Sequence, residues 1–271
     1  MTSQVQQTLT LTSKNYHSNE ANREYLSVSQ FKRFMECEAK AMAELDGSYK
    51  RPDSNALLVG SYLHSYFEGQ EAFEKFIEEH NGAIFKARGG KYSEFETADR
   101  MIETLKSDPF INFALEGDKE QIYTADLFGA KWKIKVDNIN QDRKFFSDIK
   151  TTQDLYKRYW SDKYDGWVSF VESWDYVLQM AVYRRVLQEC LGFTFTPYIV
   201  AVTKENPPNK AVIHFDESRF DFEYEYIEMK MERVLQVKSG AAKPTRCEKC
   251  DYCRATKRLD NTIEVGELIY I

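Results

Sequence analysis

The hydrophobic pattern of this chain changes period several times, and each change predicts a different kind of element. Apolar residues recur at helical spacing in three stretches of the first half, which are residues 26–45, 56–80 and 94–106. Each stretch is expected to form one helix. Ser27 or Ser29 is the expected N-cap of the first, and the second is expected to end near Asn81-Gly82.

The pattern then alternates, as is typical of strands. Residues 120–128 and 130–139 alternate around Gly129 and predict a β-hairpin. The elements expected after it are a strand over 144–151, a long helix over 167–191, strands over 195–204 and 210–215, and a helix over 217–237. This order predicts an α/β fold in which helices flank a central mixed sheet.

Length and composition favour one folded domain. The chain has 271 residues, and its aromatic share of 14% excludes a wholly disordered protein. Residues 1–25 are polar and are expected to be flexible, residues 26–258 to form the domain, and residues 259–271 to form a tail. No run of 18 apolar residues and no secretory signal is visible, so no membrane association is expected.

The net charge of −6 taken as a whole argues against nucleic-acid binding. The charge is unevenly distributed, however. Residues 237–258 hold seven basic and two acidic side chains, which gives +5 there and −11 elsewhere. A local basic surface on an otherwise acidic protein is therefore expected.

The cysteines are also unevenly placed. Cys247, Cys250 and Cys253 form a Cys-x2-Cys-x2-Cys run, and Cys37 is the best candidate for a fourth ligand. Such a run is typical of iron–sulfur clusters. Zinc is the competing interpretation, but structural zinc sites more often show two separated pairs of ligands than three plus a distant one. Three unliganded thiols are the remaining alternative. Cys190 is expected to be a small buried apolar residue.

Alternation places Asp137 on one face of its strand together with Lys131, Lys133 and Lys135. Asp148 and Lys150 likewise share a face of the next strand. Pairing of the two strands would bring Asp137 near Asp148, with Lys150 beside them. Two carboxylates and an amine suit a Mg²⁺ site, although such alternation is also ordinary on a solvated strand face.

Two helical pairs strengthen the first interpretation. His64 and Glu68 lie one turn apart on a helix that has to touch the sheet, and Gln179 and Tyr183 lie one turn apart on another. Each pair alone is unremarkable, since a lone histidine is usually a packing residue. Together with the carboxylates they form a candidate site.

In this order the residues resemble the RecB-like branch of the PD-(D/E)xK nucleases. The first carboxylate stands in Val-Asp-Asn rather than Pro-Asp, a departure seen in this divergent superfamily. With the cysteines included, the resemblance runs from about residue 16 to 258. It is nearest to phage-encoded RecE-like exonucleases, and AddB and the Cas4-like nucleases of CRISPR adaptation are also similar. The cysteine spacing is tighter than in those iron–sulfur nucleases.

The resemblance implies a restriction-endonuclease-like core and a role for each motif residue. Asp137, Asp148 and the Ile149 carbonyl would bind Mg²⁺ or Mn²⁺, and Lys150 would position the attacking water. His64 would be an added ligand, which makes Mn²⁺ acceptable, and Glu68 would reach a second metal. The other implied roles are bracing or DNA contact for Gln179 and Tyr183, and a [4Fe–4S] cluster at Cys37, Cys247, Cys250 and Cys253 that joins the two ends of the domain.

The implied function is a Mg²⁺- or Mn²⁺-dependent exonuclease that leaves 5′-phosphates. Its expected partners are linear duplex ends or single strands of DNA, a single-strand annealing protein and further copies of itself, in the cytoplasm of a bacterium or phage-infected host. The basic residues expected to contact DNA are Lys131, Lys133, Lys135, Lys243, Arg246 and Arg254. The alternatives are a Cas4-like end-trimming nuclease of CRISPR adaptation or repair, and a non-catalytic DNA-binding or assembly module.

Overall fold

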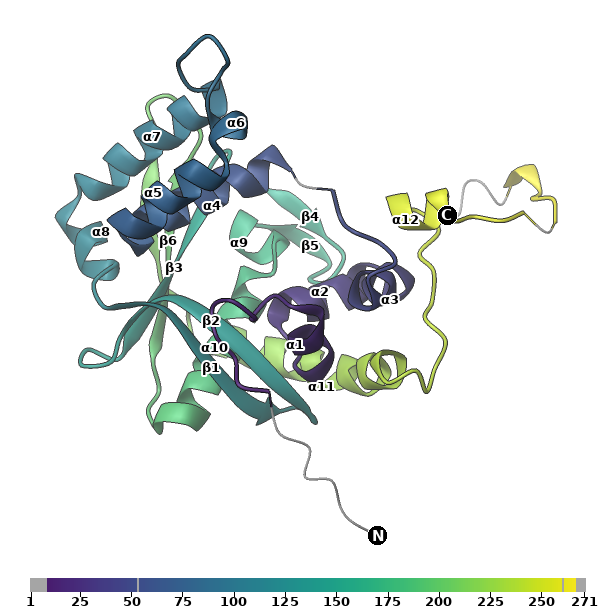
Figure 1. Cartoon of the computed structure of the whole chain (residues 1–271). Helices are drawn as coiled ribbons and strands as arrows, with labels where there is room; N and C mark the ends of the chain where they lie inside the picture. The colour runs from purple at the N-terminus through teal and green to yellow at the C-terminus, as the bar shows by residue number, and fades with distance from the viewer. Residues whose placement is uncertain (1–8, 53, 260, 267–271) are drawn as a thin grey trace.

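A five-stranded mixed sheet forms the centre of the molecule (Figure 1). The computed structural model describes residues 9–52, 54–259 and 261–266. The strands follow the order β1-β2-β3-β6-β7 across the sheet. Their bounds are Asp118–Leu127 for β1, Ala130–Asn140 for β2, Phe145–Thr152 for β3, Thr196–Thr203 for β6 and Lys210–Ile213 for β7. The expected α/β fold with helices around a mixed sheet is confirmed.

The register of the sheet follows from the chain connections. β1 and β2 form the expected antiparallel hairpin, and β2 pairs antiparallel with β3. β3 and β6 run parallel, because the connection between them crosses over through helices. β7 returns antiparallel along β6. The parallel pair lies at the centre of the sheet and is buried on both faces.

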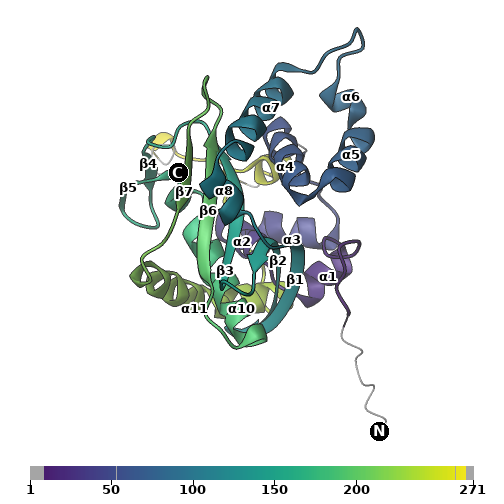
Figure 2. The same ribbon diagram turned by 90° about the vertical axis from the view of Figure 1, so that its left-hand side faces the viewer.

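Helices α4 to α8 cover one face of the sheet (Figure 2). They are α4 (Asn55–Glu68), α5 (Gln70–Glu79), α6 (Asn81–Ile84), α7 (Ser93–Lys106) and α8 (Pro109–Ala114). Their apolar sides pack on Ile149 of β3 and on Val200 and Val202 of β6.

The other face packs against a second helical layer. It contains α2 (Val28–Glu36), α3 (Glu38–Asp46), α9 (Phe170–Ser173), α10 (Tyr176–Leu191) and α11 (Ser218–Lys238). Trp132, Ile134 and Val136 of β2 are buried in this core, as their alternation predicts. β3 and β6 have apolar side chains on both faces, since Phe146, Ile199 and Ala201 lie in this core and Ile149, Val200 and Val202 in the other.

Three expected long helices are each divided in two. The first breaks at Cys37, whose extended backbone (φ −169°, ψ 111°) separates α2 from α3. The second breaks at Gly69, between α4 and α5. The third breaks before Asp175, which has a positive φ of 53°, and its first residues belong to a strand instead. Local hydrophobic spacing continues across each break, so periodicity alone does not reveal them.

A small hairpin connects the sheet to α9. β4 (Tyr159–Ser161) and β5 (Gly166–Val168) pair antiparallel as a separate two-stranded sheet. The expectation of helix from residue 167 is wrong for Trp167 and Val168, which lie in β5. This hairpin lies beside the candidate site.

The expectation of a flexible segment over 1–25 is wrong for its described part. Residues 9–25 include helix α1 (Asn19–Glu24), and Tyr16 and Ala21 are buried. Leu26 then forms a parallel bridge with Trp132, so the segment lies along β2 where β3 has already diverged. Residues 1–8 of that expected segment lie outside the described residues.

The expected tail follows α12 (Asp251–Ala255), and its residues 260 and 267–271 lie outside the described part of the chain. Over the described residues, none of the helices combines the length and apolar character needed to span a bilayer.

Candidate active site and metal centre

The sheet divides at Asp137 and Asp148. The ladder between β2 and β3 ends at the pair Asn138–Ser147. In an antiparallel register the next residues opposite each other are Asp137 and Asp148. β3 continues from there beside β6, while β2 diverges. The two carboxylates therefore stand at a fork in the sheet, which is how the expected approach of the two strands is achieved.

A histidine from the helical layer completes this group. His64 on α4 places Nδ1 2.9 Å from Asp137 Oδ2. Ligand atoms of His64, Asp137 and Asp148 all lie within 4.8 Å of one another. Because α4 packs on β3 through its apolar side, its polar residue at position 64 faces the fork. One imidazole and two carboxylates suit Mg²⁺ or Mn²⁺.

Lys150 and Gln179 both bind Asp148. The Lys150 ammonium forms an ion pair with Asp148 Oδ2 and lies 4.8 Å from the ring centroid of Tyr176. Gln179 Nε2 donates to Asp148 Oδ1 at 2.5 Å. One turn further along α10, Tyr183 stacks on Phe146 of β3, with ring centroids 6.3 Å apart. The structure thus brings Lys150 and Gln179 to Asp148, and Tyr183 to the strand that carries it.

The pKa values of the two carboxylates shift in opposite directions. Burial favours the neutral form of Asp137, but the charges of His64 and Lys150 outweigh it and lower its pKa. Burial dominates for Asp148, and its pKa is raised despite the Lys150 ammonium. Burial would lower the pKa of His64 and of Lys150, yet the neighbouring carboxylates raise both. The Asp137 carboxylate and the His64 and Lys150 cations therefore favour each other's charged forms.

The donor set fits a divalent metal. Asp137 Oδ2 and Asp148 Oδ2 are buried, and their polar neighbours are the His64 ring and the Lys150 ammonium. A hard cation would satisfy both oxygens. His64, Asp137 and Asp148 are the residues that would hold it.

Of the two further ligands expected, Glu68 is placed differently, and the Ile149 carbonyl stays a prediction. Glu68 is exposed one turn beyond His64 and is not part of the close group. Glu68 is the last residue of α4, one turn after His64, so it lies at the end of the helix rather than over the sheet. The Ile149 side chain points into the core beneath α4, and the residue also lines the cleft that contains His64 and Lys150.

Glu120 is a site residue that the sequence did not reveal. It falls opposite Asp137 in the register of β1 and β2, and its φ is +54°. Burial raises the pKa of Glu120, the Lys135 ammonium opposes this, and the charge of Asp137 adds to it. Strained residues of this kind gather at functional sites. In the sequence Glu120 is one of many charged strand residues, so no local signal distinguishes it.

The expected basic stripe on β2 is not a free surface. Lys133 is 1% exposed, and its ammonium binds Tyr16 O and Asn22 Oδ1. Lys131 pairs with Glu24 at 3.2 Å, and Lys135 pairs with Glu120. Assigning DNA contact to Lys133 is therefore wrong in this conformation, because the segment before α2 covers it.

The basic residues near the C-terminus divide into two kinds. Lys243 and Arg254 are exposed. Arg246 instead donates to Glu248 Oε1 at 2.8 Å and to Cys253 O at 2.6 Å. Its guanidinium thus holds the cysteine loop together, while the other two remain candidates for phosphate contact.

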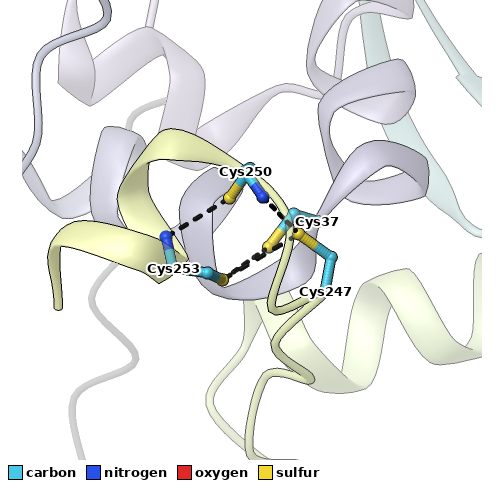
Figure 3. A group of neighbouring side chains, drawn as sticks. All are labelled: Cys37, Cys247, Cys250 and Cys253. Carbon is cyan, nitrogen blue, oxygen red and sulfur yellow. Dashed lines mark hydrogen bonds between the residues drawn. The ribbon is translucent and has the colours of Figure 1, made fainter. Parts of the chain in front are cut away.

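The four cysteines converge as expected (Figure 3). Cys37 separates α2 from α3, and the other three come from the loop around α12. The Sγ atoms of Cys37 and Cys253 are 3.6 Å apart, those of Cys247 and Cys253 are 3.9 Å apart, and all four lie within 4.8 Å. Cys190 is exposed, so its expected burial is wrong.

The cysteine loop favours a thiolate at Cys247, whereas burial raises the pKa of Cys250 and Cys253. Cys250 N donates to Cys247 Sγ at 3.3 Å, and Cys253 N donates to Cys250 Sγ at 3.4 Å. Although burial opposes it, amide donors lower the pKa of Cys247 to about 6. Thiolates are the form that binds metals, and these residues can hold one.

Comparisons with known proteins agree with this geometry. The profile of a family described as a PDDEXK-like domain of unknown function (DUF3799) matches residues 27–256. A crystal structure from Eubacterium rectale, named a "putative exonuclease", is 35% identical over 96% of this chain and 98% of its own, with a TM-score of 0.91. The structure of SSO0001 shares 13% identity over 83% of this chain and 91% of its own, and its TM-score of 0.26 carries no argument. No curated protein matches significantly.

Proposed function

This chain belongs to the PDDEXK-like family DUF3799, and from that premise we propose that it is a Mg²⁺- or Mn²⁺-dependent exonuclease that cleaves DNA. The observation that carries the proposal is the fork in the sheet. There ligand atoms of His64, Asp137 and Asp148 lie within 4.8 Å of one another, and one oxygen of each carboxylate is buried beside the His64 ring or the Lys150 ammonium. The name of the Eubacterium rectale relative supports exonuclease action in particular.

The roles of the residues follow from their contacts. A bound Mg²⁺ or Mn²⁺ would stabilise the charge that builds on the phosphate oxygens during hydrolysis. The Lys150 ammonium pairs with Asp148 at the fork, so it can orient an attacking water and offset developing negative charge. Gln179 holds the other oxygen of Asp148. Glu120 lies on the remaining side of Asp137 and adds to the negative field.

A cleavage assay tests this proposal. End-labelled linear duplex, linear single-stranded DNA and covalently closed circular DNA are incubated with Mg²⁺, Mn²⁺ or EDTA. An exonuclease degrades the linear forms, leaves the circle intact and is inactive in EDTA. Cleavage of the circle would replace the exonuclease assignment with an endonuclease. The label also reports polarity and the expected 5′-phosphate product.

Active-site variants link the activity to the fork. Asp148→Asn and Lys150→Ala should each lower the rate by at least about a hundredfold, in the range of losing one charge-stabilising group. Asp142→Asn is the matched control, since Asp142 is an exposed aspartate in the turn between the same two strands. Full activity in Asp148→Asn would overturn the proposal. Tight DNA binding without cleavage in wild type would favour the alternative, a non-catalytic module.

The four cysteines hold a structural metal centre in this proposal. Four thiolates at about 2.3 Å from one zinc ion lie about 3.8 Å apart, which the sulfur separations of 3.6 and 3.9 Å support. The resemblance to iron–sulfur nucleases favours a [4Fe–4S] cluster, in which each thiolate binds a different iron. Anaerobic purification separates the two. A brown protein that absorbs near 400 nm contains the cluster, and a colourless protein with one zinc per chain contains the ion.

The biological role is the most specific part of the proposal. Resemblance to RecE-like exonucleases favours a phage or prophage recombination enzyme that works with a single-strand annealing protein. A Cas4-like role in CRISPR adaptation is the alternative. Neighbouring genes discriminate, because an adjacent annealing protein supports recombination and adjacent integrase genes of a CRISPR locus support adaptation. Size-exclusion chromatography coupled to light scattering tests the expected homo-oligomer.

A further inference from the structure

The β4–β5 hairpin presents two tryptophans to solvent. Trp160 and Trp167 are cross-strand partners, 55% and 65% exposed, and their ring centroids are 5.9 Å apart at an interplanar angle of 81°. Their strand neighbour Tyr159 instead packs against the main core. The hairpin thus turns one face inward and leaves two indoles on the other. Exposed aromatic clusters of this kind mark interaction sites.

The hairpin is fixed to the protein by its turn. Lys163 lies 2.6 Å from Glu223 Oε2 on α11 and 2.8 Å from Asp175 Oδ1 at the start of α10. Tyr164 also donates to Glu223, which is completely buried. These contacts anchor the hairpin to the rest of the protein without using either exposed tryptophan. The two indoles pack on each other across the hairpin, and Trp160 Nε1 donates to Asp162 Oδ1 at 2.9 Å, but more than half of each side chain remains exposed.

Aromatic side chains connect the hairpin to the catalytic cleft. Tyr159 lies 6.4 Å from Trp174 between ring centroids. Both line a cleft of about 490 Å³ that also contains His64, Lys150 and Tyr176. Trp174 is 54% exposed. A DNA strand that enters the cleft from the side of the hairpin therefore passes Trp160 and Trp167 first and then meets the rings of Tyr159 and Trp174.

Positive charges lie at the end of the hairpin next to the cleft, where they can contact the phosphate backbone of DNA. Lys157 and Arg158 are exposed and directly precede Tyr159. The Lys157 ammonium lies 5.3 Å from the Tyr159 ring centroid, and the Arg158 guanidinium lies 6.0 Å from that of Trp167. The acidic residues Asp162 and Asp165 lie in the turn at the opposite end. Cations interleaved with aromatic rings are the usual surface for single-stranded nucleic acid.

We infer that the Trp160–Trp167 hairpin stacks on unpaired bases of the strand that enters the cleft, so that the substrate is DNA with a single-stranded segment beside the cut. The inference rests on the proposed nuclease function, which makes the cleft a DNA site. Indole rings stack on any base. In a duplex the base faces are already stacked on one another, so only an unpaired strand has bases free to stack on the indoles. Sequence-tolerant binding is therefore expected.

Binding measured without cleavage tests this inference. Fluorescence anisotropy in EDTA follows a labelled oligothymidylate of about 16 nucleotides, near the upper site size of such surfaces, and a blunt duplex of equal length. Trp160→Ala and Trp167→Ala should each weaken single-strand binding by about 5- to 150-fold and change duplex binding little. Trp160→Phe and Trp167→Phe keep an aromatic face and should restore most of the affinity. The Phe variants also keep the test valid if an Ala variant unfolds.

Phe193→Ala is the matched control. Phe193 is 54% exposed, its ring lies 4.2 Å from the Lys144 ammonium, and Lys144 precedes β3 at the end away from the cleft. Single-strand affinity should be unchanged in this variant. Unchanged affinity in both Trp→Ala variants, or an equal loss for single strand and duplex, would overturn the inference. A wild-type protein that binds single strands through the tryptophans but cleaves nothing would reject the nuclease proposal alone.

Discussion

His64 on α4 lies 2.9 Å from Asp137 on β2, measured between Nδ1 and Oδ2. The contact joins the helical layer to the fork in the sheet, so a nitrogen ligand stands beside two carboxylates. Nitrogen suits Mn²⁺ better than Mg²⁺. We expect His64→Asn to lower the cleavage rate in Mn²⁺ by about tenfold or more and to lower the rate in Mg²⁺ less. The comparison uses initial rates over a titration of each metal.

His80→Asn is the control for this prediction, because His80 packs on Phe76 at the end of α5 and is not part of the close group at the fork. Equal losses in the two metals would show that His64 supports the fold of the site rather than the choice of metal.

Gln179 acts through Asp148. Its side-chain amide donates to Asp148 Oδ1 at 2.5 Å, and hydrogen bonds to a charged group contribute about 1.5–3 kcal/mol. We expect Gln179→Leu to lower kcat by roughly 10- to 150-fold, to raise the Mg²⁺ concentration for half-maximal rate, and to leave KM for DNA unchanged. A rise in KM alone would instead assign Gln179 to DNA contact. Gln188→Leu, on the exposed side of the same helix, should behave like wild type.

The cysteine centre joins distant parts of the chain, since Cys37 follows α2 and its three partners lie around α12. Loss of a metal centre belongs with the changes that cost more than about 4 kcal/mol. At about 2–4 °C per kcal/mol for a chain of this size, Cys37→Ser should lower Tm by roughly 10 °C. Bound metal, measured by elemental analysis, should fall in parallel. Cys190→Ser should change neither quantity, and a full metal content in Cys37→Ser would exclude Cys37 as a ligand.

The buried Lys133 predicts a dependence of stability on pH. Burial lowers its pKa to about 8 in the folded protein, while in the unfolded chain a lysine titrates near about 10.4. Between these values the unfolded chain binds more protons, so the free energy of unfolding rises with pH. From about pH 7 to about pH 9.5, wild type should gain roughly 1–2 kcal/mol relative to Lys133→Met.

Urea unfolding at the two pH values measures this difference. Lys131→Met changes an exposed lysine on the same strand and should keep the wild-type dependence. A Lys133→Met protein whose stability follows pH as wild type does would show that the Lys133 ammonium is not desolvated.

Much of the site is visible in the sequence because it depends on local spacing. Alternation along β2 and β3 places Asp137, Asp148 and Lys150, and helical spacing places His64 and Gln179. The three clustered cysteines are equally local. In each case the residue type and its period are properties of one element, so the pattern survives without knowledge of the neighbours.

The remaining features depend on how distant segments pack. Helical periodicity continues through Cys37, yet its backbone is extended where its side chain meets the cysteines around α12. Lys133 has the alternation of a solvated residue, yet the segment that contains Tyr16 covers it. Glu120 has no local signal at all, because its importance comes from the strand opposite.

By itself, then, the sequence determined the α/β order of elements, the carboxylates and lysine of the fork and the cysteine run, since these follow from period and residue type. Tertiary structure alone decided that β2 and β3 separate after Asn138–Ser147, that His64 meets Asp137, and that Trp160 and Trp167 face solvent beside the cleft. The physical reason is that periodicity records which face of an element is apolar, whereas packing selects which other element that face meets.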